Sequence, residues 1–150
     1  MAEQIYVHYG HKNFDNDLFK PIKNISNFSK PKGGLWASRI DAKYGWREWC
    51  NDEEFRKNDE ENAFRFTLSD YAKILYIDSE DKLLNLPIQK NCIIKSWKCL
   101  DFEELLKNYY DAIEVDISKC WALYNKLYGW DCDSILIMNP DIIREIKTVG

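Results

Sequence analysis

The sequence lacks the short motifs that identify several common classes of enzyme. The 150 residues contain no His-Glu-x-x-His, Cys-x-x-Cys, Gly-x-Gly-x-x-Gly, Gly-x-x-x-x-Gly-Lys-Ser/Thr or Gly-x-Ser-x-Gly pattern. Their absence argues against a zinc protease, a zinc ribbon, the usual dinucleotide and phosphate loops, and an α/β-hydrolase. The chain has only two His, so no metal site is expected.

The chain also lacks an even set of cysteines, a long apolar run and an excess of positive charge. Its five Cys cannot all pair in a disulfide framework, so we expect reduced thiols and a cytoplasmic protein. No apolar run is long enough to cross a bilayer and no signal peptide is visible, so we expect no membrane association. A net charge of -4 argues against non-specific binding to nucleic acids or anionic lipids.

Aromatic residues, by contrast, are abundant. They make up 15% of the chain, with 6 Trp, 9 Tyr and 7 Phe. Such a composition suits a pocket that stacks a planar ligand, and it equally suits a dense core. The length fits one domain, residues 1–150, with one hydrophobic core.

Short apolar and β-branched runs alternate with a few helical patterns along the chain. Asp101 followed by Glu104 is a capping-box signature, and Asp41 is a second candidate N-cap. Strands are predicted at residues 4–9, 35–38, 63–69, 73–79, 111–117, 133–139 and 142–148. Helices are predicted at 42–58, 80–87 and 101–109, a helix or loop at 118–131, and a long loop at 13–34. This mixed order predicts an α+β fold.

Four features are candidates for a functional site. His8 lies at the end of the first predicted strand, where a histidine contacts a ligand or is satisfied by the backbone. Gly33 and Gly34 precede a strand, where they form a simple turn or let a ligand approach the backbone. Asp133 opens the most apolar strand and Glu114 is the lone acid of the run AIEV. A carboxylate in such surroundings needs a partner, which makes it a candidate functional acid unless it faces solvent.

Three separated segments stand in an order that resembles the ADP-ribosyltransferase superfamily. They read IYVHYG, GGLWASRIDAK and DSILIMNP. The resemblance is to the His-Tyr-Glu branch, which includes diphtheria-toxin-like and poly-ADP-ribose-polymerase-like members. That branch has a strand ending in His-Gly, then Gly-hydrophobic-Tyr-hydrophobic-Ala and a Ser-Lys. It ends with an acid opening a strand that runs into Asp-Pro or Asn-Pro.

The resemblance implies a compact split β-sandwich of two small sheets flanked by short helices, with NAD bound as substrate and no metal. His8 matches the residue that binds the NAD ribose, and Trp36 stands where the family places Tyr. Asp133 lies near the position of the catalytic Glu, with Glu114 as the reserve candidate. The implied NAD-binding residues are His8, Tyr9, Gly34, Leu35, Trp36, Ser38 and Tyr44.

The function implied is that of an NAD-dependent mono-ADP-ribosyltransferase, a glycosyltransferase in its chemistry. A chain of this size resembles a bare catalytic domain of a toxin, a phage effector or a defence component. It would modify a macromolecular acceptor, a protein slightly favoured over a nucleic acid because the chain is acidic. Two alternatives remain: a non-catalytic module that binds NAD, another nucleotide or a protein on the same fold, and an unrelated α+β protein whose Trp and Tyr form the core. The sequence leaves the oligomeric state open.

Overall fold

The computed structural model of the chain describes residues 4–9, 19–24, 32–41, 63–84, 86–89, 100–108, 110–127, 130 and 132–146. Within these ranges it forms seven strands and a few short helices, the mixed α+β class predicted from the sequence. The strands are β1 (Tyr6–Tyr9), β2 (Leu35–Arg39), β3 (Ala63–Leu68), β4 (Ile74–Ile77), β5 (Ala112–Val115), β6 (Ser134–Ile137) and β7 (Ile143–Ile146). The helices are α2 (Phe102–Asn108) and α3 (Ala122–Lys126), with 3-10 turns η3 (Glu80–Leu83), η4 (Ile117–Lys119) and η5 (Pro140–Ile142).

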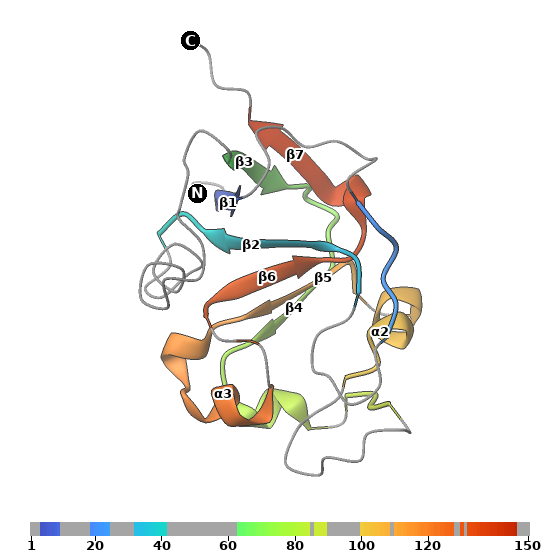
Figure 1. The fold of residues 1–150 in the computed structure, drawn as a ribbon, viewed down its shortest axis with the longest axis vertical. Coiled ribbons are helices and arrows are strands. Elements are labelled where there is room, and N and C mark those ends of the chain that lie inside the picture. The colour runs from blue at the N-terminus through green and yellow to red at the C-terminus, as the bar shows by residue number, and fades with distance from the viewer. Residues whose placement is uncertain are drawn as a thin grey trace.

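The described strands form one sheet in the order β4-β5-β6-β2-β1-β3-β7. Every neighbouring pair is antiparallel except β4 and β5, which run parallel. Figure 1 shows β2 in the middle, with β1, β3 and β7 on one side of it and β6, β5 and β4 on the other. Two separate small sheets are therefore not confirmed, because backbone pairing continues through β2 among the described strands.

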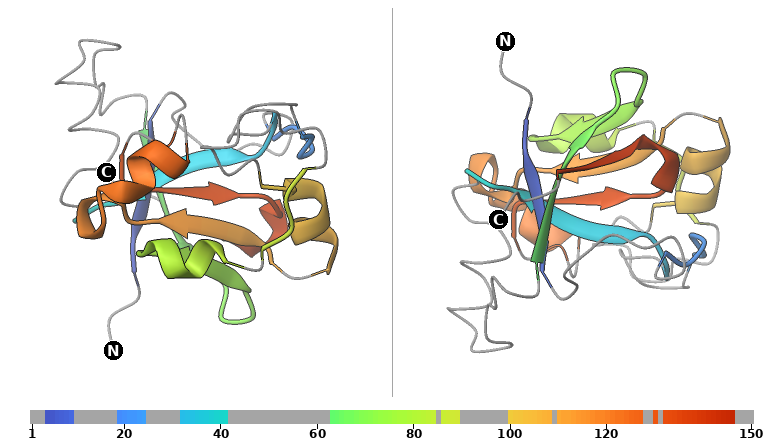
Figure 2. Two further views of the ribbon diagram at one scale, coloured as in Figure 1. Left: turned by 90° about the horizontal axis from the view of Figure 1, so that it is seen from below. Right: turned by 90° about the horizontal axis from the view of Figure 1, so that it is seen from above.

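The sheet is strongly curled. In both views of Figure 2, β1 and β3 run across the direction of β5 and β6. One hydrophobic cluster joins residues from both ends of the sheet, since Ile74 of β4 packs with the cluster that contains Ile143 of β7. We call the face that carries this cluster the inner face. Its buried residues are Tyr6, Leu35, Ala37, Phe64, Phe66, Ala112, Ile135, Ile137, Ile142 and Ile143.

A second cluster covers the opposite, outer face of the β4-β5-β6 half. Helices α2 and α3 lie against this half in Figure 1. The cluster includes Phe102 and Leu105 of α2, Leu123 of α3, and Trp130, all fully buried. Because both faces of β5 and β6 are covered, every residue of these two strands is buried. This explains why their sequences read as continuous apolar runs rather than as alternating ones.

The start of α2 follows the sequence-based prediction. The Asp101 carboxylate accepts a hydrogen bond from the Glu104 amide at 3.1 Å, which is the predicted N-cap. Asn24, far away in the chain, accepts from the Phe102 amide at 2.8 Å and donates to Asp101 at 2.8 Å. These two hydrogen bonds fix the segment around Asn24 to the N-terminus of α2. The helix predicted at 42–58 and most of the loop at 13–34 lie outside the described residues.

Candidate functional site

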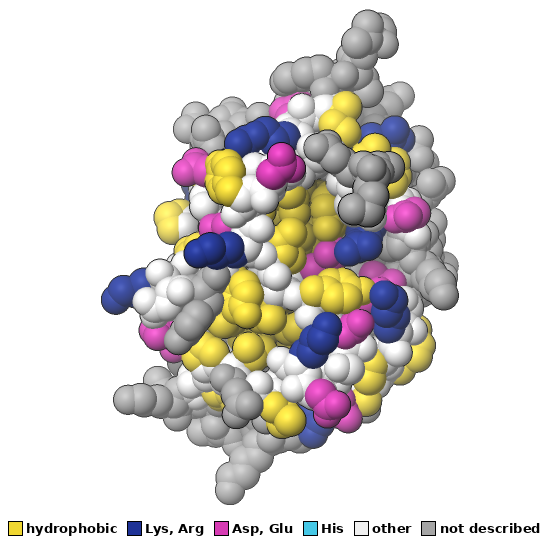
Figure 3. Space-filling model, turned by 180° about the vertical axis from the view of Figure 1, so that it is seen from behind, with side chains coloured by type: hydrophobic (Ala, Val, Ile, Leu, Met, Phe, Trp, Pro, Cys, Tyr) yellow, Lys and Arg dark blue, Asp and Glu magenta, His cyan; other side chains and the backbone are white. Residues whose placement is uncertain are grey.

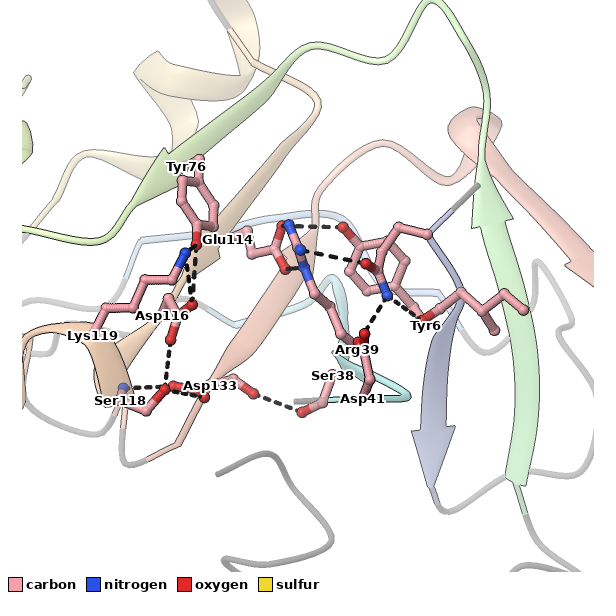
Figure 4. A network of polar contacts seen from close by, with 12 residues as sticks. Tyr6, Ser38, Arg39, Asp41, Tyr76, Glu114, Asp116, Ser118, Lys119 and Asp133 are labelled. Atoms are coloured by element: carbon pink, nitrogen blue, oxygen red, sulfur yellow. Dashed lines mark hydrogen bonds and ion pairs between the residues drawn. The ribbon is translucent and has the colours of Figure 1, made fainter. Parts of the chain in front are cut away.

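A buried carboxylate lies on the inner face. Glu114 of β5 is opposite Ile135 of β6 and Tyr76 of β4, and it is 6% exposed. Arg39 of β2 donates to both of its oxygens, from Nε to Oε2 at 2.6 Å and from Nη2 to Oε1 at 3.1 Å. The Tyr6 hydroxyl of β1 donates to Oε1 at 3.0 Å (Figure 4). The carboxylate that the sequence left without a partner thus receives three hydrogen bonds from two other strands.

The charges of this cluster stabilise one another. The hydrogen bond to Glu114 is the largest cause that raises the pKa of Arg39 above its ordinary value, so the guanidinium stays charged. Burial, followed by the negative charge of Glu114, raises the pKa of Tyr6, so its hydroxyl stays a donor. A bidentate pair of this kind fixes the orientation of the carboxylate as well as its partner.

His8 lies on the same inner face. It is directly opposite Phe64 of β3, and the centres of the two rings are 5.1 Å apart. Its Nδ1 lies 2.7 Å from the carbonyl oxygen of Trp36. A carbonyl oxygen only accepts, so this contact requires the proton on Nδ1. His8 and Tyr6 are two residues apart in β1, so their side chains share a face, and Tyr6 reaches Glu114.

Trp36 points to the other face. It lies opposite Leu136 of β6, and its ring meets Trp130 edge-on, with the ring centres 4.6 Å apart. Both of these partners belong to the outer core. The aromatic ring that the resemblance assigns to nicotinamide therefore packs among outer-core residues, while only the backbone carbonyl of Trp36 reaches His8. The side chains of His8 and Trp36, which the resemblance assigns to one site, thus lie on opposite faces of the sheet.

Asp133 takes part in a separate network at the start of β6. It is 7% exposed, and its carboxylate accepts from the Ser118 amide at 2.8 Å. The Ser118 hydroxyl lies 2.8 Å from one oxygen of Asp133 and 2.8 Å from one oxygen of Asp116. It has one proton, so it donates to one carboxylate at a time. The backbone oxygen of Asp133 accepts from the Ser38 hydroxyl at 2.7 Å, which connects this network to β2.

Tyr76 and Lys119 extend this network beyond Asp116. Its hydroxyl donates to Asp116 at 3.0 Å and accepts from Lys119 at 2.9 Å (Figure 4). Burial would raise the pKa of Asp116, but hydrogen bonds from Ser118 and Tyr76 outweigh it and hold the pKa below its ordinary value. The ring of Tyr76 also has Arg39 at 5.6 Å and Lys82 at 5.3 Å from its centre. The two acidic networks thus meet at this ring.

The pH dependence of stability tests the second network. Because the pKa of Asp116 is depressed in the folded state, its contribution is present above its unfolded pKa of about 3.9 and is lost as the pH falls through the folded value. We expect Asp116→Asn to lower the free energy of unfolding by about 1–2 kcal/mol at pH 7. The difference from wild type should shrink as the pH approaches 3 in urea titrations.

The matched control for that experiment is Asp78→Asn, which removes a partly exposed partner of Lys82. It should change the free energy of unfolding at pH 7 by less than about 0.5 kcal/mol. If the free energy of unfolding of Asp116→Asn differs from that of wild type by the same amount at every pH, the depressed pKa of Asp116 does not contribute to stability.

The glycine pair serves packing in the described structure. Gly33 and Gly34 have φ angles of 82° and 76°, which favour glycine. A Cβ on Gly33 would lie 2.1 Å from the Pro21 carbonyl oxygen, and one on Gly34 would lie 2.6 Å from a methyl carbon of Leu136. The Gly34 amide donates to the Lys20 carbonyl at 2.9 Å. Protein atoms thus occupy the position that a Cβ would take at each glycine, as in a packed turn.

The remaining predicted binding residues are spread over both faces. Leu35 is buried in the inner core, and Ser38 is buried beside Asp133. Tyr9 ends β1 opposite Ala63 and is partly buried. Tyr44 lies outside the described residues. Residues of the two networks that sequence reasoning missed are Tyr6, Arg39, Tyr76, Asp116 and Ser118.

A signal for Arg39 was present in the sequence. It follows Ala37 at a spacing of two, so both side chains share one face of a strand. A buried acid in AIEV needs a partner, and Arg39 is a basic residue directly after the predicted strand 35–38. Tyr6 and Ser118 gave no comparable signal, because their roles depend on strand order.

The surface adds a further observation. Seen from behind, the molecule has a hollow with hydrophobic side chains on its floor and both basic and acidic side chains at its margins (Figure 3). In the described ranges, no group of three or more His, Cys, Asp or Glu side chains is placed to hold a metal ion. None of the helices described is long and apolar enough to cross a membrane.

Comparison with known proteins gives no relative. No protein-family model matches the chain, and neither curated proteins nor solved structures yield a significant match.

Proposed function

We propose that this chain is an NAD-dependent mono-ADP-ribosyltransferase of the His-Tyr-Glu kind. The carrying observation is the strand order: β1 with His8, β2 with Trp36, and β6 preceded by Asp133 are consecutive neighbours in the sheet. The resemblance requires these three segments to meet, although they are far apart in sequence. Direct contacts support their meeting, since His8 reaches the Trp36 carbonyl and Ser38 reaches the Asp133 carbonyl.

We propose that the curled sheet is the split β-sandwich that the resemblance implies. Its two parts would be β1, β3 and β7 on one side and β4, β5 and β6 on the other, joined through β2. The inner core contains residues from both parts, as the two facing layers of a sandwich would. The change of strand direction in Figure 2 supports this division.

The reaction would break the bond between the nicotinamide nitrogen and C1′ of the ribose. The bonding electrons leave with nicotinamide, which becomes neutral, and an acceptor oxygen or nitrogen bonds to C1′ and loses its proton. The oxocarbenium-like state between these events needs a nearby carboxylate. Of the two candidate acids, Glu114 shares the inner face with His8, whereas the Asp133 carboxylate is directed toward Ser118. This favours Glu114 for that role.

The acceptor in this proposal is a macromolecule, with a protein favoured over a nucleic acid because the net charge is -4. The proposed setting is the cytoplasm, as the odd cysteine number indicates. A toxin, a phage effector or a defence component would fit a catalytic domain of this size.

Release of nicotinamide from labelled NAD tests the transferase directly. We expect release by the wild-type protein, and a loss of about 100-fold or more in Glu114→Gln, because removing one electrostatic stabiliser typically costs this much. Asp133→Asn decides between the two acids. Glu80→Gln, a change at an exposed acid on η3, should behave as wild type. Absence of release by the wild type, with several candidate acceptors present, would refute the transferase.

A binding module is the second candidate, and one observation favours it. Both carboxylates are already held by protein donors, Glu114 by Arg39 and Tyr6, and Asp133 by Ser118. A site of this kind can hold NAD without cleaving it. Titration calorimetry with NAD, showing binding in a protein that releases no nicotinamide, would support this second candidate.

A further inference from the structure

We propose that Arg39 and Tyr6 are positioning residues that orient the Glu114 carboxylate for the reaction. This inference rests on the proposed transferase function and assigns the acid of its site to Glu114. Neither residue was among the candidates read from the sequence, and neither is assumed to touch NAD.

The geometry leaves Glu114 one orientation. Arg39 contacts both carboxylate oxygens through its planar guanidinium, so rotation of the carboxylate about its own axis breaks one of the two bonds. Tyr6 adds a third donor from β1 to the oxygen that already accepts from Nη2. The carboxylate is thus held from β1 and β2 while it is attached to β5.

Arg39 is itself held by a further contact. Its Nη1 donates to the Gln4 side-chain oxygen at 3.3 Å, and the Gln4 amide group donates to Asp41 at 3.2 Å. Asp41 follows β2 and Gln4 precedes β1, so this chain of contacts connects one end of the antiparallel β1–β2 pair to the acid (Figure 4). The Arg39 guanidinium is held by Glu114 and by Gln4, so Arg39 loses little further freedom when a ligand binds. A positioning role requires such prior order.

Stability alone does not account for the arrangement. Ion pairs buried in an apolar interior contribute little net stability compared with apolar residues of similar volume. Glu114 lies beside the apolar residues Ala112 and Ile135 on the inner face, with Tyr76 as its neighbour on β4. Apolar residues at both positions 39 and 114 would pack on that face without burying a charge. The three donors instead fix the carboxylate in one orientation, which is the property that a positioning role needs.

Steady-state kinetics of nicotinamide release test the proposal. Tyr6→Phe keeps the ring and removes one hydroxyl, so the protein should fold, and kcat should fall about 10-fold while KM stays within about 2-fold. Tyr71→Phe is the matched control, because it removes an exposed hydroxyl that contacts the Asp141 carbonyl oxygen and Arg144 rather than Glu114. It should keep kcat within about 2-fold.

Rescue by a conservative change separates positioning from packing. Arg39→Met should lower kcat about 100-fold, and Arg39→Lys should recover part of this loss because a charged donor returns. Equal kcat values in Tyr6→Phe and Tyr71→Phe, or full activity in Arg39→Met, would overturn the proposal while the transferase stands. Loss of activity in Asp133→Asn but not in Glu114→Gln would also overturn the positioning proposal and leave the transferase function in place. A wild-type protein that releases no nicotinamide would refute both the transferase function and the positioning role.

Discussion

Replacing Gly33 with Ala is expected to lower the free energy of unfolding by about 3–4 kcal/mol. The left-handed φ of 82° alone costs an alanine about 1–2 kcal/mol. Its Cβ would also lie 2.1 Å from the Pro21 carbonyl oxygen and 2.6 Å from the Lys20 carbonyl oxygen. Both neighbours are backbone atoms that cannot rotate away, so the segment must shift, at a further cost of about 2 kcal/mol. Urea-induced unfolding monitored by Trp fluorescence measures the change.

A second variant at the same position separates the two causes. Asparagine tolerates a left-handed backbone better than alanine, yet it has the same Cβ. If the collision with Pro21 dominates, Gly33→Asn loses nearly as much stability as Gly33→Ala. A loss below about 1 kcal/mol in both variants would mean that Pro21 and Lys20 do not pack against Gly33.

Removing the guanidinium of Arg39 should lower the free energy of unfolding by about 3 kcal/mol. Glu114 is 6% exposed, so Arg39→Met leaves a buried carboxylate with Tyr6 as its remaining donor from the cluster. An uncompensated buried charge typically costs about 3–5 kcal/mol, and the 39% exposure of the Arg39 side chain argues for the lower end. The measurement is urea-induced unfolding of the single and double variants at one pH.

The double variant Arg39→Met/Glu114→Gln should be more stable than Arg39→Met alone. The amide of glutamine carries no charge to bury, and its oxygen still accepts from Tyr6. The coupling free energy in this cycle should be about 1.5–3 kcal/mol. Arg144→Met, which removes an exposed guanidinium stacked on Tyr71, is the control and should cost less than about 1 kcal/mol. If the changes in unfolding free energy at Arg39 and Glu114 simply add, the two side chains do not interact as described.

The strands of this protein could be predicted because their signals are local. Six predicted strand runs contain a described strand, β2 extends one residue past the predicted run 35–38, and the Asp101 cap depends on residues three positions apart. Strand order could not be predicted, because pairing partners such as β2 and β6 are far apart in the chain. The contact between Arg39 and Glu114 depends on this strand order, so the sequence indicated only that the acid in AIEV needs a partner.

The faces of the sheet explain most of the remaining differences. A side chain takes the inner or the outer face according to strand register, and register depends on pairing. His8 and Trp36 were expected at one site, yet antiparallel pairing of β1 and β2 directs their rings to opposite faces. The glycine pair was read as a turn or a ligand approach, and the structure shows a turn packed against Pro21 and Lys20.

The central place of β2 has a consequence for how the sequence can change in length. This strand of five residues pairs with β1 on one edge and with β6 on the other. One inserted or deleted residue inside it would exchange the faces of every residue that follows. Arg39 would then leave Glu114, and the outer core would receive a charge. A change of length between residues 35 and 39 would therefore shift the two halves of the sheet out of register with each other.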